Sequence, residues 1–347
     1  MPAARSITIV GGGLAGLTLG IALRRREIPV RLHEAGHYPR HRVCGEFISG
    51  RGQASLVRLG LQDVFTNAGA VSAGTAAFFS ATRPTPPRAL PSAAMCLSRF
   101  ALDVALAARF QELGGELLAG KRWLAENDAE GVVRATGRQA QVEQGNERWF
   151  GLKIHAQNVP LTADLEMHVL RHGYVGLCQL ANGEVNICGL FHRRSGEHSA
   201  ASNLREWLHG EPGSILRKRL AVAHFDDRSF CAVAGISLRP QRAVAHAEVC
   251  IGDAITMIPP VTGNGMSMAF ESAELAVAPL VGWSCGDISW AEARRQIANR
   301  CDAAFASRLR WAKWLQRCLL TPAFHNPLVA VMSRSEWLWQ MAFERTR

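Results

Sequence analysis

Several features that whole classes of protein depend on are scarce or missing from this sequence. The 347 residues contain only two tyrosines, and none of the nine cysteines forms a C-x-x-C pair. No apolar run reaches the roughly 18 residues that cross a bilayer. These absences argue against a transmembrane helix, a zinc site and a disulfide framework. No pattern of a nucleic-acid-binding module occurs either, so no nucleic-acid partner is expected.

The composition is that of a globular protein with a basic surface. Hydrophobic residues make up 48% of the chain and charged residues 20%. The formal net charge of +10 could attract an anionic membrane surface or an acidic carrier protein, although solubility is its simpler explanation. Because an apolar strand begins near Ser6, we expect no signal peptide and a cytoplasmic location, with peripheral membrane contact left open.

The most informative stretch is the glycine turn that follows the first strand. Residues 7–16 read Ile-Thr-Ile-Val-Gly-Gly-Gly-Leu-Ala-Gly, which gives the spacing G-x-G-x-x-G at Gly11, Gly13 and Gly16. In a dinucleotide site these glycines permit a tight turn, a close pyrophosphate and close helix packing. Glu34 ends the next strand-like run, where an acid binds a ribose hydroxyl.

A second motif lies some 235 residues further on. A strand over 247–251 ends in Gly252-Asp253, and a loop rich in Pro and Gly over 258–265 leads into a long helix. A carboxylate at a strand end binds polyol hydroxyls, and a helix N-terminus stabilises negative charge. One extended cofactor that joins both motifs fits FAD better than NAD.

Hydrophobic periodicity predicts the remaining elements. Helices are expected over 14–26, 51–66, 98–110, 202–220 (broken at 210–213) and 289–320. Strands are expected over 70–80, 169–180 and 184–190, with a hairpin turn at Asn182-Gly183. The apolar stripe of the 289–320 helix either packs on the core or, with the tryptophans near the C-terminus, contacts a membrane.

These motifs together give the chain a resemblance to FAD-dependent oxidoreductases with the para-hydroxybenzoate-hydroxylase fold, over about residues 6–285. Within them it is most similar to the geranylgeranyl-reductase-like branch. The implied fold class is α/β: a Rossmann-like FAD-binding domain of the GR2 type, an inserted mixed antiparallel-sheet substrate domain, and C-terminal helices. The expected boundaries are 1–70, 95–145 and 245–285 for the FAD-binding domain, 71–94 and 146–244 for the substrate domain, and 286–347 for the helical segment.

The resemblance also implies which residues hold FAD. The pyrophosphate would lie on the glycine turn, the adenosine ribose on Glu34, and the ribityl chain near Arg99 and Asp253. The loop over 263–266 would lie at the pyrimidine edge of the flavin. The full set of expected cofactor residues is Gly11, Gly13, Leu14, Ala15, Gly16, Glu34, Arg42, Cys44, Gly45, Arg99, Gly252, Asp253, Pro260, Gly263, Asn264, Gly265 and Met266.

The sequence also departs from the family pattern. The hydroxylases carry an Asp-Gly pair that couples FAD to NAD(P)H, where this chain has Ala135-Thr136-Gly137-Arg138. Without a second glycine turn for a nicotinamide nucleotide, the electron donor is expected to be external or transiently bound, with NAD(P)H left open. Flavin halogenases carry W-x-W-x-I-P, whereas Trp337-Leu338-Trp339 comes too late in this chain and lacks the Ile-Pro, which argues against halogenation.

Three residues are candidates for catalysis. Cys44 precedes Gly45 in a pair that matches the Cys-Gly of the reductase branch, and its thiol could protonate a substrate or simply shape the pocket. Lys153 and His155 alternate toward one face of a strand and could polarise a substrate oxygen or move protons. Tyr174 could line the same pocket, although core packing is its simpler role.

Three functions remain open from the sequence. The first is a flavin monooxygenase that hydroxylates or epoxidises an apolar, lipid-like or carrier-bound small molecule. The second is a flavin-dependent reductase of carbon–carbon double bonds. The third is a binding protein in which FAD only stabilises the fold. The monooxygenase leads on fold frequency alone, whereas Cys44-Gly45 and the missing Asp-Gly pair favour the reductase.

Overall fold

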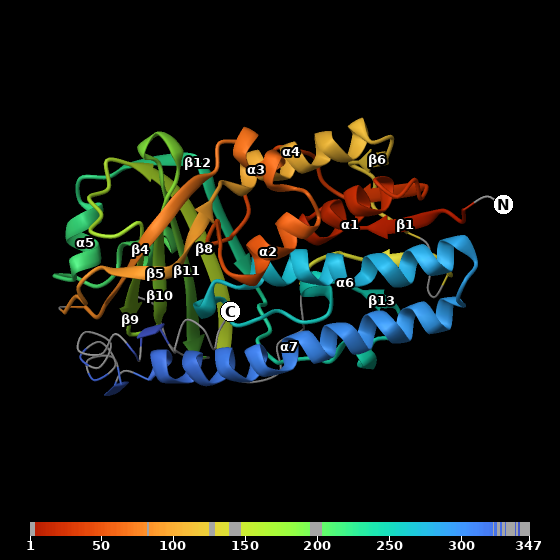
Figure 1. Ribbon diagram of the computed structural model, residues 1–347. Coiled ribbons are helices and arrows are strands. Elements are labelled where there is room, and N and C mark those ends of the chain that lie inside the picture. Colours follow the sequence, from red (N-terminus) through yellow and green to blue (C-terminus); the bar gives the residue numbers. More distant parts are fainter. Residues whose placement is uncertain are drawn as a thin grey trace.

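Two β-sheets lie at opposite ends of the molecule, and two long helices run between them (Figure 1). The computed structural model describes residues 4–81, 83–124, 129–138, 147–194 and 203–321, together with 323, 324, 327, 330, 337, 339 and 340. The N-terminal end of the chain lies beside the smaller sheet, at the far end from the larger one.

The smaller sheet has five parallel strands in the order β13-β7-β1-β2-β6. Its strands are β1 (Ile7–Val10), β2 (Val30–Glu34), β6 (Glu116–Ala119), β7 (Val132–Arg134) and β13 (Val249–Cys250). Helices α1 (Leu14–Arg24), α4 (Arg99–Glu112) and α6 (Gly265–Cys285) pack around it. Strands β1 and β13, which precede the two glycine motifs, are both neighbours of β7 in this sheet. One ligand can therefore reach both motifs.

The larger sheet has eight strands in the order β12-β8-β11-β10-β9-β4-β5-β3. Its pairs are antiparallel except for β4 with β9, which are parallel. The strands are β3 (Phe47–Ile48), β4 (Val71–Phe79), β5 (Arg88–Cys96), β8 (Glu147–Gln157), β9 (Leu165–Leu170), β10 (Gly173–Gln179), β11 (Val185–Arg194) and β12 (His224–Ala234). The predicted α/β class, with a parallel and a mixed sheet, is confirmed.

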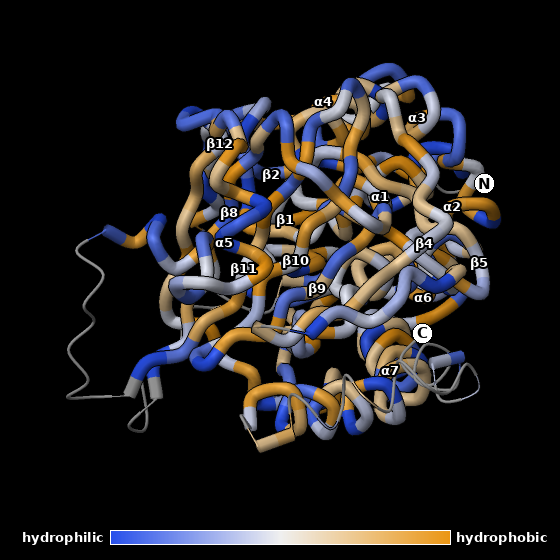
Figure 2. The backbone as a smooth tube through the Cα atoms, turned by 90° about the vertical axis from the view of Figure 1, so that its left-hand side faces the viewer, coloured by the Kyte–Doolittle hydropathy of each residue, from blue (hydrophilic) through white to orange (hydrophobic). Residues whose placement is uncertain are grey.

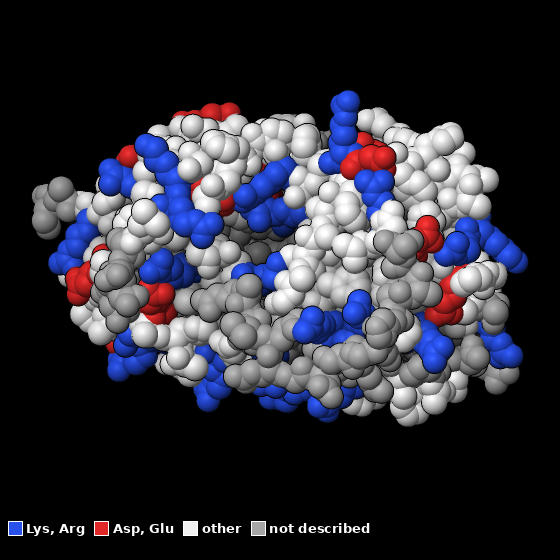
Figure 3. Space-filling view, turned by 180° about the vertical axis from the view of Figure 1, so that it is seen from behind, with Lys and Arg blue, Asp and Glu red and all other residues white. Residues whose placement is uncertain are grey.

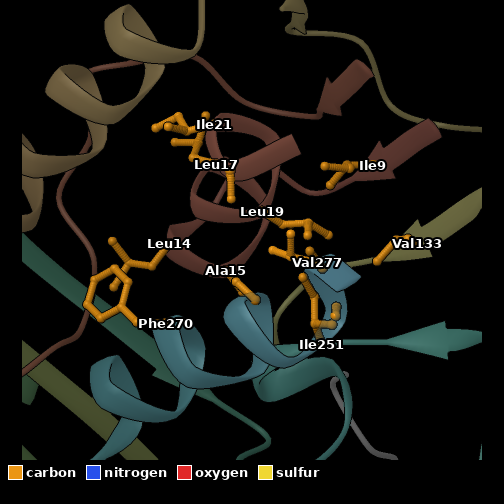
Figure 4. Close-up of a cluster of buried hydrophobic side chains, with 14 of the residues drawn as sticks. Ile9, Leu14, Ala15, Leu17, Leu19, Ile21, Val133, Ile251, Phe270 and Val277 are labelled. Carbon is orange, nitrogen blue, oxygen red and sulfur yellow. The ribbon is translucent and has the colours of Figure 1, made fainter. Parts of the chain in front are cut away.

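The main hydrophobic core surrounds the smaller sheet. Leu17, Leu19 and Ile21 of α1 are fully buried against Ile9 of β1 and Val277 of α6 (Figure 4). Burying side chains of this size stabilises the fold by about 1.5–3 kcal/mol each. Helix α1 is buried over most of its length because it lies between the sheet and α6.

Helix α7 (Trp290–Leu320) covers the molecule along one side and reaches from β13 to β9. Ser289 caps it by accepting a hydrogen bond from the Glu292 backbone N–H at 3.2 Å. Apolar and polar residues alternate along it (Figure 2), and the apolar stripe is buried against the core from Ile297 to Leu319. No helix in the part of the chain described here has the length and apolarity to cross a membrane.

Two element predictions are wrong in detail. The helix expected over 51–66 is two helices, α2 (Arg51–Arg58) and α3 (Gln62–Asn67), because Gly60 takes a φ of +66° that ends the first. The strand expected over 169–180 is the end of β9 and all of β10, because the chain reverses between Leu170 and Gly173. The helix expected over 202–220 is interrupted at 210–213 as predicted, because η2 (Leu204–His209) ends before this stretch and α5 (Ile215–Leu220) begins after it. The predicted turn also forms, with a positive φ at both Asn182 and Gly183. The other short turns are η1 (Ala181–Gly183), η3 (Ala243–Ala245), η4 (Gly252–Ala254) and η5 (Pro260–Thr262).

A buried ion pair fixes α7 to α6. The Arg308 guanidinium donates two hydrogen bonds to the Glu271 carboxylate, at 2.7 and 2.6 Å. Arg308→Met leaves Glu271 buried without its partner, so we expect the free energy of unfolding to fall by about 3–5 kcal/mol in urea titrations. The double variant Arg308→Met/Glu271→Leu should recover most of that loss.

The exposed Arg310 is the matched control on the same helix. Arg310→Met should change the free energy of unfolding by less than about 0.5 kcal/mol. Equal losses for Arg308→Met and Arg310→Met would show that the ion pair does not hold the helix.

Candidate functional site

A cavity of about 1130 Å³ extends from the carboxyl ends of β1 and β2 to the larger sheet, and α7 closes part of it. Figure 3 shows Lys and Arg side chains around a hollow on the face opposite to that of Figure 1. Basic residues outnumber acidic ones on the walls, which favours an anionic ligand. The arginines are Arg40, Arg42, Arg99, Arg122, Arg134 and Arg138, and the acids are Glu34, Glu46, Glu166 and Asp253.

The glycine turn forms one end of this cavity, and each glycine has a separate steric role. At Gly11, where φ is +112°, a Cβ atom would lie 2.3 Å from the Ala135 carbonyl oxygen. At Gly16 a Cβ atom would lie 2.0 Å from the Gly11 carbonyl oxygen. A Cβ atom at Gly13 would meet nothing within 4 Å, and Gly13 borders the cavity. Gly11 and Gly16 therefore allow close packing, and Gly13 leaves space for a ligand to approach the backbone.

Two helix N-termini border the cavity. Helix α1 begins at Leu14 after Gly13, and α6 begins at Gly265 after Asn264. Gly13 has no side chain to cap α1, the Asn264 side chain makes no capping hydrogen bond to α6, and neither helix has an acidic residue in its first turn. Both helices therefore offer N–H groups and a partial positive charge to a ligand. The residues that line the cavity from these two first turns are Leu14, Ala15, Gly265, Met266 and Ala269.

Glu34 lies at the end of β2, beside the glycine turn. Its carboxylate accepts hydrogen bonds from the backbone N–H groups of Gly12 and Gly36, both at 2.8 Å, and pairs with Arg40 at 2.7 Å. Burial alone would raise the pKa of Glu34, but these partners outweigh burial and hold it below its ordinary value. Glu34 is therefore ionised at neutral pH. The Tyr38 hydroxyl closes this corner by donating to the Gly12 carbonyl at 2.5 Å.

Two arginines on the cavity wall are held by one buried carboxylate. Arg99 donates to Asp103 through two atoms, at 2.7 and 2.9 Å, and Arg42 lies 3.2 Å from the same carboxylate. Asp103 is fully buried, and Arg42 also lies 3.8 Å from Glu34. Burial opposes the charge on Arg99, but Asp103 keeps the Arg99 pKa above its ordinary value. Burial and the neighbouring Arg99 charge instead lower the pKa of Arg42 from its ordinary value. The shared carboxylate holds both guanidinium groups in fixed positions.

Cys44 lies on the cavity wall between the arginines and the larger sheet. Its carbonyl accepts a hydrogen bond from Asn186 on β11 at 2.9 Å, and its sulfur accepts one from the Glu46 backbone N–H at 3.5 Å. Burial raises the pKa of the Cys44 thiol, although Arg99 acts in the opposite direction. At neutral pH the sulfur therefore carries its proton, so it is a weak acid rather than a nucleophile. Gly45 follows it on the wall.

Lys153 and His155 point to the same side of β8, as their spacing predicts, and both meet Glu46. Lys153 Nζ lies 3.4 Å from Glu46 Oε1 and 3.0 Å from His41 Nδ1. His155 Nε2 lies 2.7 Å from Glu46 Oε2, and His155 Nδ1 lies 3.2 Å from Glu184 Oε1. Burial would lower the pKa of His155, but the two carboxylates raise it above its ordinary value. Glu46 and His41 line the cavity, whereas Lys153 and His155 lie behind them.

The second glycine motif closes the cavity near α6. Gly252 takes a φ of +62°, and Asp253 follows it beside Arg99 and Arg138. Burial raises the pKa of Asp253 to about 6, although both arginines act to lower it. In the adjoining loop Gly263 takes a φ of +64°, and a Cβ atom there would lie 2.1 Å from the Phe47 ring.

The structure brings most of the expected cofactor residues to the one cavity. Those that line it are Gly11, Gly13, Leu14, Ala15, Glu34, Arg42, Cys44, Gly45, Arg99, Asp253, Pro260, Gly263, Gly265 and Met266. Gly16, Gly252 and Asn264 lie next to lining residues and shape the backbone there.

Several residues of the site were missed by sequence reasoning. Asp103 stands four positions after Arg99, a helical spacing that could have indicated the ion pair. Glu46, His41 and Glu184 lie in loops that are distant in sequence from Lys153 and His155, so no local pattern indicates their contacts with these two residues. Tyr174, for which the sequence left both a pocket-lining and a core-packing role open, is buried and lines the cavity, and its hydroxyl has no hydrogen-bond partner among the described residues.

The overall structure is similar to solved flavoproteins. A flavoprotein/dehydrogenase from Cytophaga hutchinsonii is 13% identical with a TM-score of 0.76, over 98% of this chain and 92% of that chain. A geranylgeranyl bacteriochlorophyll reductase-like protein from Thermoplasma acidophilum is 16% identical with a TM-score of 0.73, over 99% and 96%. A halogenase variant in complex with FAD is 14% identical with a TM-score of 0.68, over 98% and 85%.

These likenesses confirm the predicted fold, which is that of FAD-dependent oxidoreductases. No protein-family model matches the sequence, and no curated protein matches it. At 13–16% identity the likeness extends to the fold, and the function must be argued from the site.

The raised pKa of Asp253 predicts a pH-dependent cost to stability. A carboxyl whose folded pKa is about 6 and whose ordinary pKa is 3.8 takes up protons on folding, so folding stability falls as the pH rises through that window. In the ligand-free protein at neutral pH, Asp253→Asn should raise the free energy of unfolding by about 1–2 kcal/mol, an estimate reduced for partial exposure.

The advantage of Asp253→Asn should shrink as the pH is lowered toward 3.8, which urea titrations at several pH values can follow. Asp287→Asn, at an exposed carboxylate, is the control and should change the free energy of unfolding by less than about 0.5 kcal/mol. An Asp253→Asn gain that does not vary with pH would contradict the buried ionised carboxylate.

Proposed function

We propose that this chain is an FAD-dependent oxidoreductase that acts on an apolar small molecule. The observation that carries the proposal is one cavity bordered by the uncapped N-termini of both α1 and α6 and by the larger sheet. A ligand that reaches from one N-terminus to the other needs an anionic middle and a polar ring at one end. FAD has that shape and charge.

The residues present fit FAD at each point. Space beside Gly13 accepts a pyrophosphate at the N-terminus of α1, and Arg42 and Arg99 supply fixed positive charge. Glu34 presents an ionised carboxylate to ribose hydroxyls, and Asp253 does the same for the ribityl chain. The N-terminus of α6 would stabilise negative charge on the flavin pyrimidine edge. When bound, FAD supplies the exchange of hydride or electrons that these side chains lack.

The rest of the cavity indicates the kind of substrate. Residues of β4, β9 and β10 form one wall, and α7 forms another with Trp311, Trp314, Leu315 and Leu319. Two polar side chains interrupt this apolar surface: Glu166 of β9, which is already bonded to Thr162 and His168, and Tyr174, whose hydroxyl has no partner among the described residues. Burial raises the pKa of Tyr174 well above the ordinary value, so the hydroxyl stays protonated and can donate a hydrogen bond. The substrate is therefore a largely apolar molecule with one polar atom, free or attached to a carrier.

Within this class we propose monooxygenation, because the largely apolar wall suits oxygen transfer to an apolar substrate. Reduction of a carbon–carbon double bond is the second candidate, and the protonated Cys44 thiol on the cavity wall supports it. Residues 135–138 offer no carboxylate to couple NAD(P)H binding, which supports an external electron donor.

Rapid mixing distinguishes the two reactions. The purified protein is reduced without oxygen and mixed with dioxygen while flavin absorbance is followed. A monooxygenase should form an absorbing species distinct from both oxidised and reduced flavin, which then decays. Direct recovery of the oxidised spectrum, with or without candidate substrates, would favour the reductase. A colourless protein that binds no added FAD would overturn the whole proposal, and FAD that is never reduced would leave only a binding role.

Gly13 provides a direct test of the cofactor position. Gly13→Leu places a side chain in cavity space without a clash at Cβ, so we expect a correctly folded protein with roughly 100-fold weaker FAD binding. Gly74→Leu is the control, because a Cβ atom at Gly74 also meets nothing within 4 Å and Gly74 lies outside the cavity. Equal FAD affinity for both variants, measured by fluorescence titration, would place the pyrophosphate elsewhere.

A further inference from the structure

A chain of hydrogen-bonded side chains leads from the surface to the cavity beside Cys44. The Glu184 side chain is 31% exposed, His155 is 2% exposed, and Glu46 is fully buried on the cavity wall. Exposure falls along this order while each neighbour stays within hydrogen-bond distance. The three residues come from different parts of the chain and meet only in the folded structure.

The geometry at His155 is that of a bridge. Its two ring nitrogens face two different carboxylates, Nδ1 toward Glu184 at 3.2 Å and Nε2 toward Glu46 at 2.7 Å. An imidazole held in this way can accept a proton on one nitrogen and release one from the other. The Ser229 hydroxyl accepts a hydrogen bond from the His155 backbone N–H at 2.7 Å, which fixes this part of β8.

The other charged neighbours leave this route open. Glu46 Oε1 accepts a hydrogen bond from the Arg99 backbone N–H at 2.8 Å and lies 3.4 Å from Lys153, so Oε2 is the oxygen that faces His155. Lys153 in turn contacts His41, which also feels the charge of Asp226. Lys153 balances the negative charge of Glu46, so neither residue is an isolated buried charge.

We propose that Glu184, His155 and Glu46 conduct protons from solvent to the cavity, where Glu46 releases them beside Cys44. This inference rests on the proposed function, because flavin chemistry in the cavity is what consumes the protons. Glu46 is then a catalytic residue that neither its sequence position nor the glycine motifs indicate. His155 and Glu184 pass protons to Glu46 from the side that faces away from the cavity. His155 thus takes part in proton transfer although it does not line the cavity.

The proton balance can be tested without knowing the substrate. With FAD bound and reduced, dioxygen would receive two electrons and one proton from it, and hydrogen peroxide needs one further proton. On this proposal protonated His155 passes a proton to the Glu46 carboxylate, Glu46 delivers it to the cavity, and Glu184 reprotonates His155 from solvent. Each proton that Glu46 releases is thus replaced, through His155 and Glu184, by a proton from water.

The experiment compares flavin reoxidation in H₂O and D₂O for the FAD-loaded protein and four variants. Glu46→Gln should slow the appearance of oxidised flavin roughly 100-fold, and Glu184→Gln and Glu184→Ala about 10-fold. Added formate or imidazole should restore much of the rate to Glu184→Ala, because removing the side chain that contacts His155 leaves space there for a small acid. Glu206→Gln is the control, since Glu206 is a half-exposed carboxylate paired with Arg217 in the same part of the fold.

Thermal stability and FAD affinity, measured on the same samples, separate proton transfer from structural support. A slower rate and a changed solvent isotope effect, at unchanged FAD affinity and with rescue by formate, support the proton path. Rates in Glu46→Gln and Glu184→Gln equal to that of Glu206→Gln would overturn it and leave FAD binding intact. Slow reoxidation that formate and imidazole do not rescue would make the network structural, and a protein without flavin would overturn the proposed function itself.

Discussion

The site depends on one steric constraint, which is the close approach of three backbone segments at the glycine turn. The end of β1, the start of α1 and the segment after β7 meet at Gly11, Gly16 and Ala135, where a Cβ atom on either glycine would overlap a carbonyl oxygen. This contact sets the direction of α1 and therefore the point at which its N–H groups face the cavity. This contact therefore also sets the open space beside Gly13, the position of Glu34 next to the turn, and the distance between the N-termini of α1 and α6.

Buried charge is the second constraint on the site. Asp103 holds two arginines toward the cavity, and Glu46 holds a lysine and a histidine beside it. Such groups contribute little to net stability, because desolvation offsets much of their attraction. Their contribution is to position: Asp103, behind the wall, fixes Arg42 and Arg99 on the wall before any ligand binds. A ligand that enters therefore meets charges that need little rearrangement.

The sequence predicts the parts of the molecule that local patterns control. The glycine turn, the Gly252-Asp253 strand end and the helix expected over 289–320 each have a local signature, and each lies where that signature predicts. The helix over 51–66 was predicted wrongly because one positive φ at Gly60 interrupts an otherwise continuous apolar pattern. Glu46, His155 and Glu184 were beyond prediction as a group. The β8–β11 register places Glu184 near His155, whereas Glu46 comes from the loop before β3, and no local pattern encodes either contact.

Helix α7 adds a wall to the cavity from a part of the chain that supplies none of the expected FAD-binding residues. The expected FAD-binding residues all precede residue 267, whereas α7 supplies Trp311, Trp314, Leu315 and Leu319 to the far wall. Substitutions on that face of α7 can therefore reshape the pocket for a new molecule while the groups expected to hold the cofactor stay unchanged. A lineage with this architecture can diversify what it acts on without rebuilding how it acts.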